Sequence, residues 1–137
     1  MVIGLDRRLL DCYYNLRDNL VVARPLGMEN RPSELYGRTI RKKTACGNFF
    51  VTLNRNSEGK LVEIFCKLGK TGNCAAAYSE ALARMVAVAL AYGAEVSEVV
   101  DHLRGIRCDK QWGLGLQQVL SCPDALALIL EEEKENQ

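Results

Sequence analysis

The chain has 137 residues, of which 48% are hydrophobic and 26% are charged, and its formal net charge at pH 7 is +1. This length suits a single domain with a core of its own, and the composition is that of a globular protein rather than a disordered or fibrous one. The near-neutral charge gives no global indication of nucleic acid or an anionic membrane as partner, because binding to either draws on a large field of one sign.

No stretch has the roughly 20 uninterrupted apolar residues of a membrane span. The longest apolar run, 81–94, contains Arg84 and reaches Gly93, and it is expected to be a buried helix. Residues 1–8 carry charge before any long apolar region, so we expect no secretory signal and a cytoplasmic location. In a reducing cytosol, six cysteines indicate metal or redox chemistry more than a disulfide framework.

Residues 6–22 are predicted to be helical, because apolar side chains recur there at steps of three and four residues. Pro25 closes this segment, and the turn-forming residues of 26–32 indicate a connector. We therefore expect residues 1–30 to form a helical arm and residues 31–137 to form the main domain. The amphipathic helix of the arm is a candidate contact for a homo-oligomer.

Three antiparallel strands are predicted after the connector. Apolar residues occupy the odd positions of 49–53 and the even positions of 62–68, as in strands with one buried face. The turn-rich loop 54–59 favours a hairpin between them, and residues 39–44 are predicted as the third strand. Basic residues cluster on this third strand, namely Arg38, Arg41, Lys42 and Lys43. Their chief interpretation is protection of an edge strand against aggregation, and a phosphate-binding patch is the alternative.

Three helices are predicted downstream of the strands. Residues 75–91 are rich in Ala, Leu and Met, and Gly93 suits a left-handed C-terminal cap. A second helix is expected over 97–103 with Ser97 as its N-cap, and a third over 122–133 with proline in its first turn. This order predicts an α+β fold, in which a three-stranded antiparallel sheet carries helices packed on one face.

Four cysteines lie at junctions between the predicted elements, beside glycine, proline or a helix start: Cys46, Cys74, Cys108 and Cys122. Backbone N–H groups are free at such junctions, and a helix N-terminus favours the thiolate that a metal requires. Zinc binds four such ligands tetrahedrally, so the junctions are candidates for gathering around one ion. No two of these cysteines form a C-x-x-C pair, and separate burial of each as a small hydrophobic residue is the alternative.

Other chemically notable residues have simpler interpretations. Cys66 lies on an apolar strand face and Cys12 within the first predicted helix, so both are expected to be packing residues. His102 beside an apolar stripe and Asp124 in a first helical turn are weaker candidate ligands. Trp112 lies in a glycine-containing loop. It is expected to pin that loop over the core, and exposure as an anchor for a partner is the alternative.

Several short motifs occur together between residues 31 and 130. They are Arg31-Pro32 to Leu35, Gly37, Thr39, Cys46-Gly47-Asn48, Gly69-Lys70, Cys74-Ala75-Ala76, Ser79-Glu80-Ala81, Gly105-Ile106-Arg107-Cys108 and Leu120-Ser121-Cys122-Pro123-Asp124. In combination they resemble the TSCPD domain. That module is known as the C-terminal domain of adenosylcobalamin-dependent (class II) ribonucleotide reductases, and also as short independent proteins. Leu120 replaces the leading threonine of the signature, which is expected to remove one hydroxyl hydrogen bond near the cysteine.

The resemblance implies a metal site, because the family's cysteines match Cys46, Cys74, Cys108 and Cys122 one by one. It does not imply reductase activity, because radical reduction needs a cobalamin-binding barrel and further reactive cysteines that 137 residues are not expected to supply. The chain is therefore expected to be a zinc-binding, non-catalytic accessory module with a ribonucleotide reductase catalytic subunit as candidate partner in DNA synthesis.

A second likeness concerns topology alone. The order of the elements and the cysteine placement are similar to those of iron–sulfur cluster scaffold proteins, so a cluster or metal carrier is the alternative function. A thiol enzyme is least favoured, because the one histidine has no cysteine neighbour in sequence.

Overall fold

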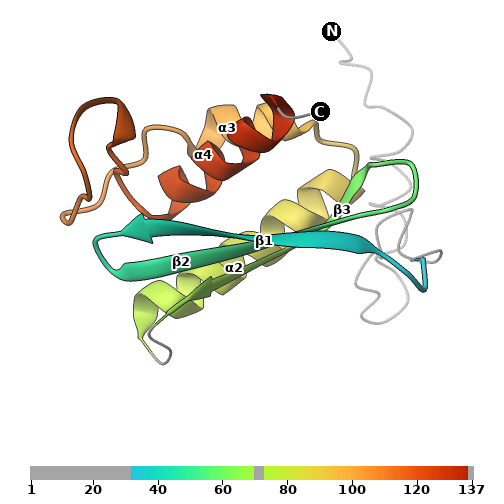
Figure 1. The fold of residues 1–137 in the computed structure, drawn as a ribbon, viewed down its shortest axis with the longest axis horizontal. Helices are drawn as coiled ribbons and strands as arrows, with labels where there is room; N and C mark the ends of the chain where they lie inside the picture. The colour runs from blue at the N-terminus through green and yellow to red at the C-terminus, as the bar shows by residue number, and fades with distance from the viewer. Residues whose placement is uncertain (1–31, 70–72, 136–137) are drawn as a thin grey trace, which may run out of the picture. The chain divides into compact units, whose positions relative to one another are not determined.

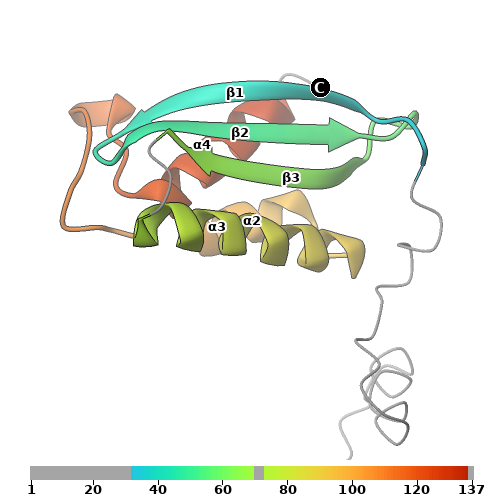
Figure 2. The same ribbon diagram turned by 90° about the horizontal axis from the view of Figure 1, so that it is seen from below.

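The computed structural model of the chain describes residues 32–69 and 73–135. Its elements, in chain order, are β1 (Tyr36–Thr44), β2 (Gly47–Arg55), β3 (Leu61–Leu68), α2 (Cys74–Ala91), α3 (Val96–Leu103), the 3₁₀ turn η3 (Gly115–Gln117) and α4 (Cys122–Glu135). This is the predicted α+β order, and the three helices lie on one face of the sheet (Figures 1 and 2). The helix predicted over 6–22, together with Cys12, lies outside the described residues.

The sheet is antiparallel throughout, with strand order β1-β2-β3. β1 and β2 form a tight hairpin in which Thr44 pairs with Gly47. Gly47 has a φ of 127°, a conformation that glycine adopts at no steric cost. The inward side chains of β2 are at most 1% exposed; they are Phe49, Val51 and Leu53. The predicted alternation of this strand is therefore confirmed.

The alternation of β3 is shifted near the start of the strand. A register shift between Asn54 and Arg55 places Arg55 opposite Leu61. Leu61 is therefore buried, whereas Val62, for which the sequence predicts an inward side chain, is only half-buried. A bulge moves the side chains beyond it to the other face of a sheet, and the residue pattern alone does not show where one occurs.

One face of α2 packs against the sheet. Its buried residues recur at steps of four and three, and they are Ser79, Ala83, Val86 and Leu90. The opposite face is exposed, with Tyr78 at 77% and Met85 at 64%. The expectation that the run 81–94 is buried is therefore wrong for that face. In the described part of the chain, α2 is long and apolar enough to cross a membrane. The core helix of a soluble protein passes the same test, so this is weak evidence for a membrane span.

α3 begins one residue before the predicted start and uses a different cap. The carboxylate of Glu98 accepts the backbone N–H of Glu95 at 2.8 Å, completing a reciprocal capping box, so Glu95 and not Ser97 is the N-cap. α4 supplies much of the core, because Leu126 and Ile129 are 0% exposed. It begins at the predicted Cys122.

The four basic residues of β1 divide between the two faces of the sheet. Arg38 and Lys42 lie on the helix side, where they pair with two glutamates of α4. Arg41 and Lys43 alternate with them and therefore lie on the outer face. The ion pairs give Arg38 and Lys42 a specific contact with α4, which protection of an edge strand alone does not predict.

Candidate functional site

The segment Leu120–Asp124 forms the N-terminal cap of α4. Ser121 Oγ accepts the backbone N–H of Asp124 at 3.1 Å, and the Ser121 carbonyl accepts the first helical hydrogen bond, so Ser121 is the N-cap. The same hydroxyl donates to the carbonyl of Ile106 at 2.7 Å. Cys122 therefore stands at the first helical position, where free N–H groups and the helix dipole favour a thiolate.

Asp124 anchors the loop after α3 to the start of α4. The residue is 0% exposed. Its Oδ1 accepts hydrogen bonds from Arg104 Nη1 and from the Gly105 N–H, both at 3.0 Å. Its Oδ2 accepts the N–H of Leu120 at 3.0 Å. Because both oxygens are engaged, the structure gives Asp124 a positioning role rather than that of a ligand.

Cys108 is brought beside the start of α4 by backbone pairing. Its N–H donates to the carbonyl of Leu120 at 3.0 Å, two residues before Cys122. Its thiol donates to Asp109 Oδ1 at 3.1 Å. This hydrogen bond is the main cause that lowers the pKa of the Asp109 carboxyl.

Cys46 and Cys108 both interact electrostatically with Cys122. The pKa of the Cys122 thiol is raised, first by burial and then by the charge of Cys46, with a smaller effect from Cys108. Hydrogen bonds with the hydroxyls of Ser79 and Thr44 act in the opposite direction and lower it. Thiols from three separate segments thus share one neighbourhood, and a cation among them would offset both the burial and the mutual repulsion of their thiolates.

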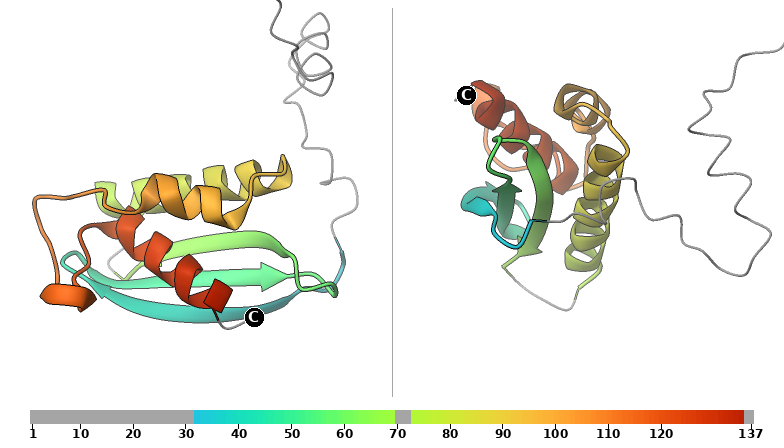
Figure 3. Two further views of the ribbon diagram at one scale, coloured as in Figure 1. Left: turned by 90° about the horizontal axis from the view of Figure 1, so that it is seen from above. Right: turned by 90° about the vertical axis from the view of Figure 1, so that its right-hand side faces the viewer.

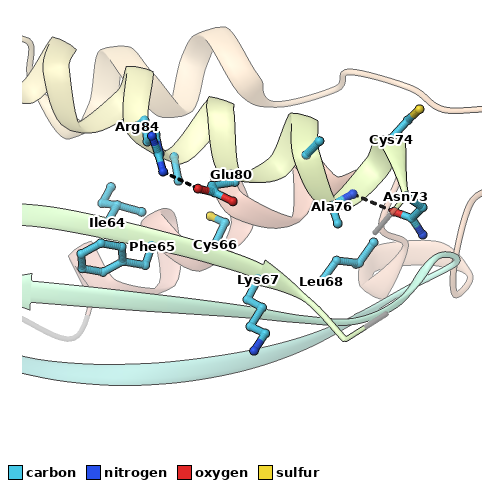
Figure 4. A pocket seen from close by; sticks show the side chains of 12 residues that line it. Ile64, Phe65, Cys66, Lys67, Leu68, Asn73, Cys74, Ala76, Glu80 and Arg84 are labelled. Atoms are coloured by element: carbon cyan, nitrogen blue, oxygen red, sulfur yellow. Dashed lines mark hydrogen bonds and ion pairs between the residues drawn. The ribbon is translucent and has the colours of Figure 1, made fainter. Parts of the chain in front are cut away.

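Cys74 lies at the same end of the molecule but apart from this cluster. The β1–β2 turn, the start of α2 and the start of α4 are at one end of the sheet (Figures 2 and 3). Cys74 is the first residue of α2 and is exposed. In Figure 4 its sulfur points away from Cys66. Five residues further along this helix, Ser79 contacts Cys122.

Four cysteine thiols are a chemically suitable ligand set for zinc, although in the structure their sulfur atoms do not surround a common point. Within residues 32–69 and 73–135, no three His, Cys, Asp or Glu side chains lie close enough together to hold an ion. Three thiols nevertheless share one neighbourhood, a fourth begins a helix at the same end, and hydroxyls hydrogen-bond one sulfur. Zinc binding by all four would require Cys74 to turn toward the others and the sulfur atoms of Cys46, Cys108 and Cys122 to approach one another more closely.

The remaining candidate residues are not part of the predicted ligand set, although Cys66 also interacts electrostatically with Cys122. Cys66 is 7% exposed, and burial, with a smaller effect of Cys122, raises the pKa of its thiol from 9.0 to about 12. Its predicted packing role is confirmed. His102 is exposed in the last turn of α3. Trp112 is 40% exposed, Lys43 Nζ lies 4.2 Å from its ring centroid, and Trp112 is not among the described hydrophobic residues packed against the core.

Two hydroxyl residues of the site are missing from the sequence-based prediction. Ser79 and Thr44 are 3% and 4% exposed, and both contact Cys122. A signal for Ser79 exists, because it is the polar member of an otherwise apolar inner helix face. Thr44 ends β1 and donates to the carbonyl of Gly47 at 2.9 Å. That hairpin contact becomes evident only from the fold.

Alkylation is expected to separate Cys74 from Cys66. In the metal-free protein at about pH 8, Cys74 should react fastest because it is exposed, and Cys66 slowest because its thiol is buried and protonated. Timed pulses of iodoacetamide followed by peptide mass spectrometry measure the two rates. A urea-unfolded sample, in which both should react alike, is the control, and equal rates in the folded protein would contradict these placements.

The fold and the cluster define a small α+β domain with a thiol-rich end. The family model of the TSCPD domain matches residues 21–134. This is most of the chain, which therefore belongs to the TSCPD family, and the predicted resemblance is confirmed. No curated protein and no solved structure matches the chain. The TSCPD domain is associated with ribonucleotide reductases.

Proposed function

We propose that this chain is a zinc-binding accessory module of ribonucleotide reductase, related to the C-terminal domain of the adenosylcobalamin-dependent enzymes and non-catalytic by itself. Membership of the TSCPD family supports the association with the reductase. The single observation that carries the metal proposal is the gathering at one end of the sheet of the β1–β2 turn with Cys46, the start of α2 with Cys74 and the start of α4 with Cys122, to which the Cys108 N–H is hydrogen-bonded through the Leu120 carbonyl. A reducing cytoplasm, where thiols stay available for metal, is the proposed location.

Cys46, Cys74, Cys108 and Cys122 would hold the ion. A structural zinc ion supplies positive charge that stabilises thiolates and joins segments that are distant along the chain. Here those segments are the β1–β2 turn, the start of α2, the loop after α3 and the start of α4. Thr44 and Ser79, whose hydroxyls donate to the carbonyls of Gly47 and Ala75, would line the sulfur of Cys122.

Two observations favour a structural role for these thiols over a catalytic one. A nucleophilic cysteine is ordinarily activated by an adjacent base. His102 is exposed on α3, and both oxygens of Asp124 accept hydrogen bonds from the surrounding loop. Neither residue is therefore positioned to deprotonate Cys122.

The proposed partner is a reductase catalytic subunit. The exposed side of α2 carries large apolar side chains, including Tyr78, Met85 and Tyr92. Clustered exposed apolar side chains of this kind are commonly buried by partner proteins. This face lies on the side of α2 away from its buried residues, so a partner could cover it without disturbing the core.

Metal removal tests the proposal. Anaerobically purified protein should be colourless and contain one equivalent of zinc. A chelator that removes this zinc should lower the melting temperature by more than about 10 °C, because the binding energy of a structural ion contributes to folding. Complete removal of zinc without any change in the melting temperature would exclude a structural ion.

The exposure of Cys74 favours one alternative, a carrier of iron–sulfur clusters or metal. A site that exchanges its occupant needs an accessible ligand, and Cys74 is the exposed thiol among the four. Under this alternative the anaerobically purified protein would be brown and would contain iron and sulfide. The same sample therefore distinguishes the two functions by its absorption spectrum.

A further inference from the structure

The outer face of the sheet, away from the helices, carries two cations on either side of a phenylalanine. The strand register places Arg41 opposite Phe50, and Phe50 opposite Lys67. Arg41 and Lys67 are exposed and Phe50 is half-buried. Figure 4 shows Lys67 on the opposite side of β3 from Cys66. Because side chains directly opposite one another are about 5 Å apart at Cβ, these three form one continuous row.

The next row of the same face adds a second aromatic ring. Thr39, Thr52 and Phe65 are opposite one another in the register, and the hydroxyls of Thr39 and Thr52 are hydrogen-bonded at 2.8 Å. Phe65 is 56% exposed. It stands one diagonal step from Phe50, a separation of about 7–8 Å. Both phenylalanines, both threonines and Lys67 line one open hollow on this face.

The charges of this face are of nearly one sign. Within the described part of the chain, Arg41, Lys43 and Lys67 form no ion pair. Among the outward-facing residues of the three strands the one carboxylate is Glu63. It lies in the row next to Phe65, where it accepts a hydrogen bond from Asn54. Within the described residues none of these cations is neutralised by a carboxylate, and the contact of Lys43 Nζ with the Trp112 ring, 4.2 Å from its centroid, leaves that charge uncompensated.

We infer that this face binds single-stranded nucleic acid. Phe50 and Phe65 stack against two bases, while Arg41, Lys43 and Lys67 contact the phosphates. Exposed aromatic side chains on a β-sheet suit this ligand, because every base has a π-face and the flanking cations follow the backbone. This inference is independent of the zinc proposal, since none of these residues belongs to the thiol cluster.

The near-neutral net charge of the whole chain does not reveal this basic surface, because the alternation of side chains along β1 divides its basic residues between the two faces of the sheet. Arg38 and Lys42 are neutralised by α4, which leaves the other cations of β1 on the outer face. A membrane surface fits less well than a nucleic acid. Insertion at a lipid interface uses protruding apolar side chains, but of the two phenylalanines Phe65 alone protrudes, since Phe50 is half-buried in a hollow.

Fluorescence anisotropy of a labelled oligothymidylate, titrated with the full chain at several salt concentrations, tests the inference. Binding should weaken with salt at a log–log slope of about −2, as expected for three phosphate contacts on a single strand. Phe65→Ala should weaken binding about tenfold through the loss of one stacking contact. Phe65→Leu, which keeps an apolar side chain without the ring, should weaken it similarly.

A pair of matched charge reversals tests the location of the site. Lys67→Glu should weaken binding at least about tenfold, whereas Lys60→Glu, the same charge change in the β2–β3 turn, should change it less than about threefold. Equal losses from both variants, or no binding at low salt, would overturn the inference. Anionic phospholipid vesicles bound through Lys67 in place of the oligonucleotide would also overturn it. Circular dichroism and thermal melts verify that each variant is folded.

Discussion

Replacing Asp124 with alanine is expected to lower the free energy of unfolding by about 3–5 kcal/mol. The buried carboxylate accepts hydrogen bonds from Arg104, from the Gly105 N–H and from the Leu120 N–H. Alanine leaves these donors without their acceptor and releases the loop after α3 from the start of α4. Urea unfolding followed by circular dichroism measures the loss.

Two further substitutions separate the causes of that loss. Asp124→Asn keeps the side-chain volume and one acceptor oxygen, so it should cost clearly less than the alanine variant. Asp101→Ala removes an exposed carboxylate from α3 and should change the stability by less than about 0.5 kcal/mol. An Asp124→Ala protein as stable as the wild type would contradict the anchoring role.

Replacing Cys122 with serine is expected to abolish tight zinc binding. A serine hydroxyl does not substitute for the thiolate, imidazole or carboxylate ligands of structural zinc, and its similar size leaves the start of α4 intact. The melting temperature should fall as far as chelation lowers that of the wild type, and a chelator should lower it no further. Zinc content and thermal melts, each with and without chelator, provide the measurement.

Cys66→Ala is the matched control for this substitution. Cys66 is buried under α2 outside the proposed ligand set, so its loss should cost about 1 kcal/mol of packing and leave one equivalent of zinc. A Cys122→Ser protein with a full complement of zinc would rule out Cys122 as a ligand. Loss of zinc from both variants would show general destabilisation instead.

Local patterns are sufficient to predict the order of the elements. The alternation of β2 and the composition of 75–91 determine a strand and a helix that the structure contains. The errors in the sequence-based prediction arise at positions whose conformation depends on contacts with other residues. Val62 is only half-buried because a bulge shifts the strand register. Glu95 rather than Ser97 is the N-cap of α3, because the Glu98 side chain accepts the backbone N–H of Glu95.

The candidate site is less visible in the sequence than the fold. Junction positions single out Cys46, Cys74, Cys108 and Cys122 as candidates, and the structure adds the interactions of Cys122 with Cys46 and with Cys108. Asp124 is an anchor because Arg104 and Gly105 come to it across the chain, and such tertiary contacts leave no local pattern. The outer sheet face is likewise apparent only when the register sorts each strand into two sides.

X-ray absorption at the zinc edge of the purified protein tests the central claim most directly. Coordination by Cys46, Cys74, Cys108 and Cys122 predicts a shell of four sulfur atoms at about 2.3 Å. A shell dominated by nitrogen or oxygen, or a protein that retains no zinc under anaerobic purification, would contradict the claim.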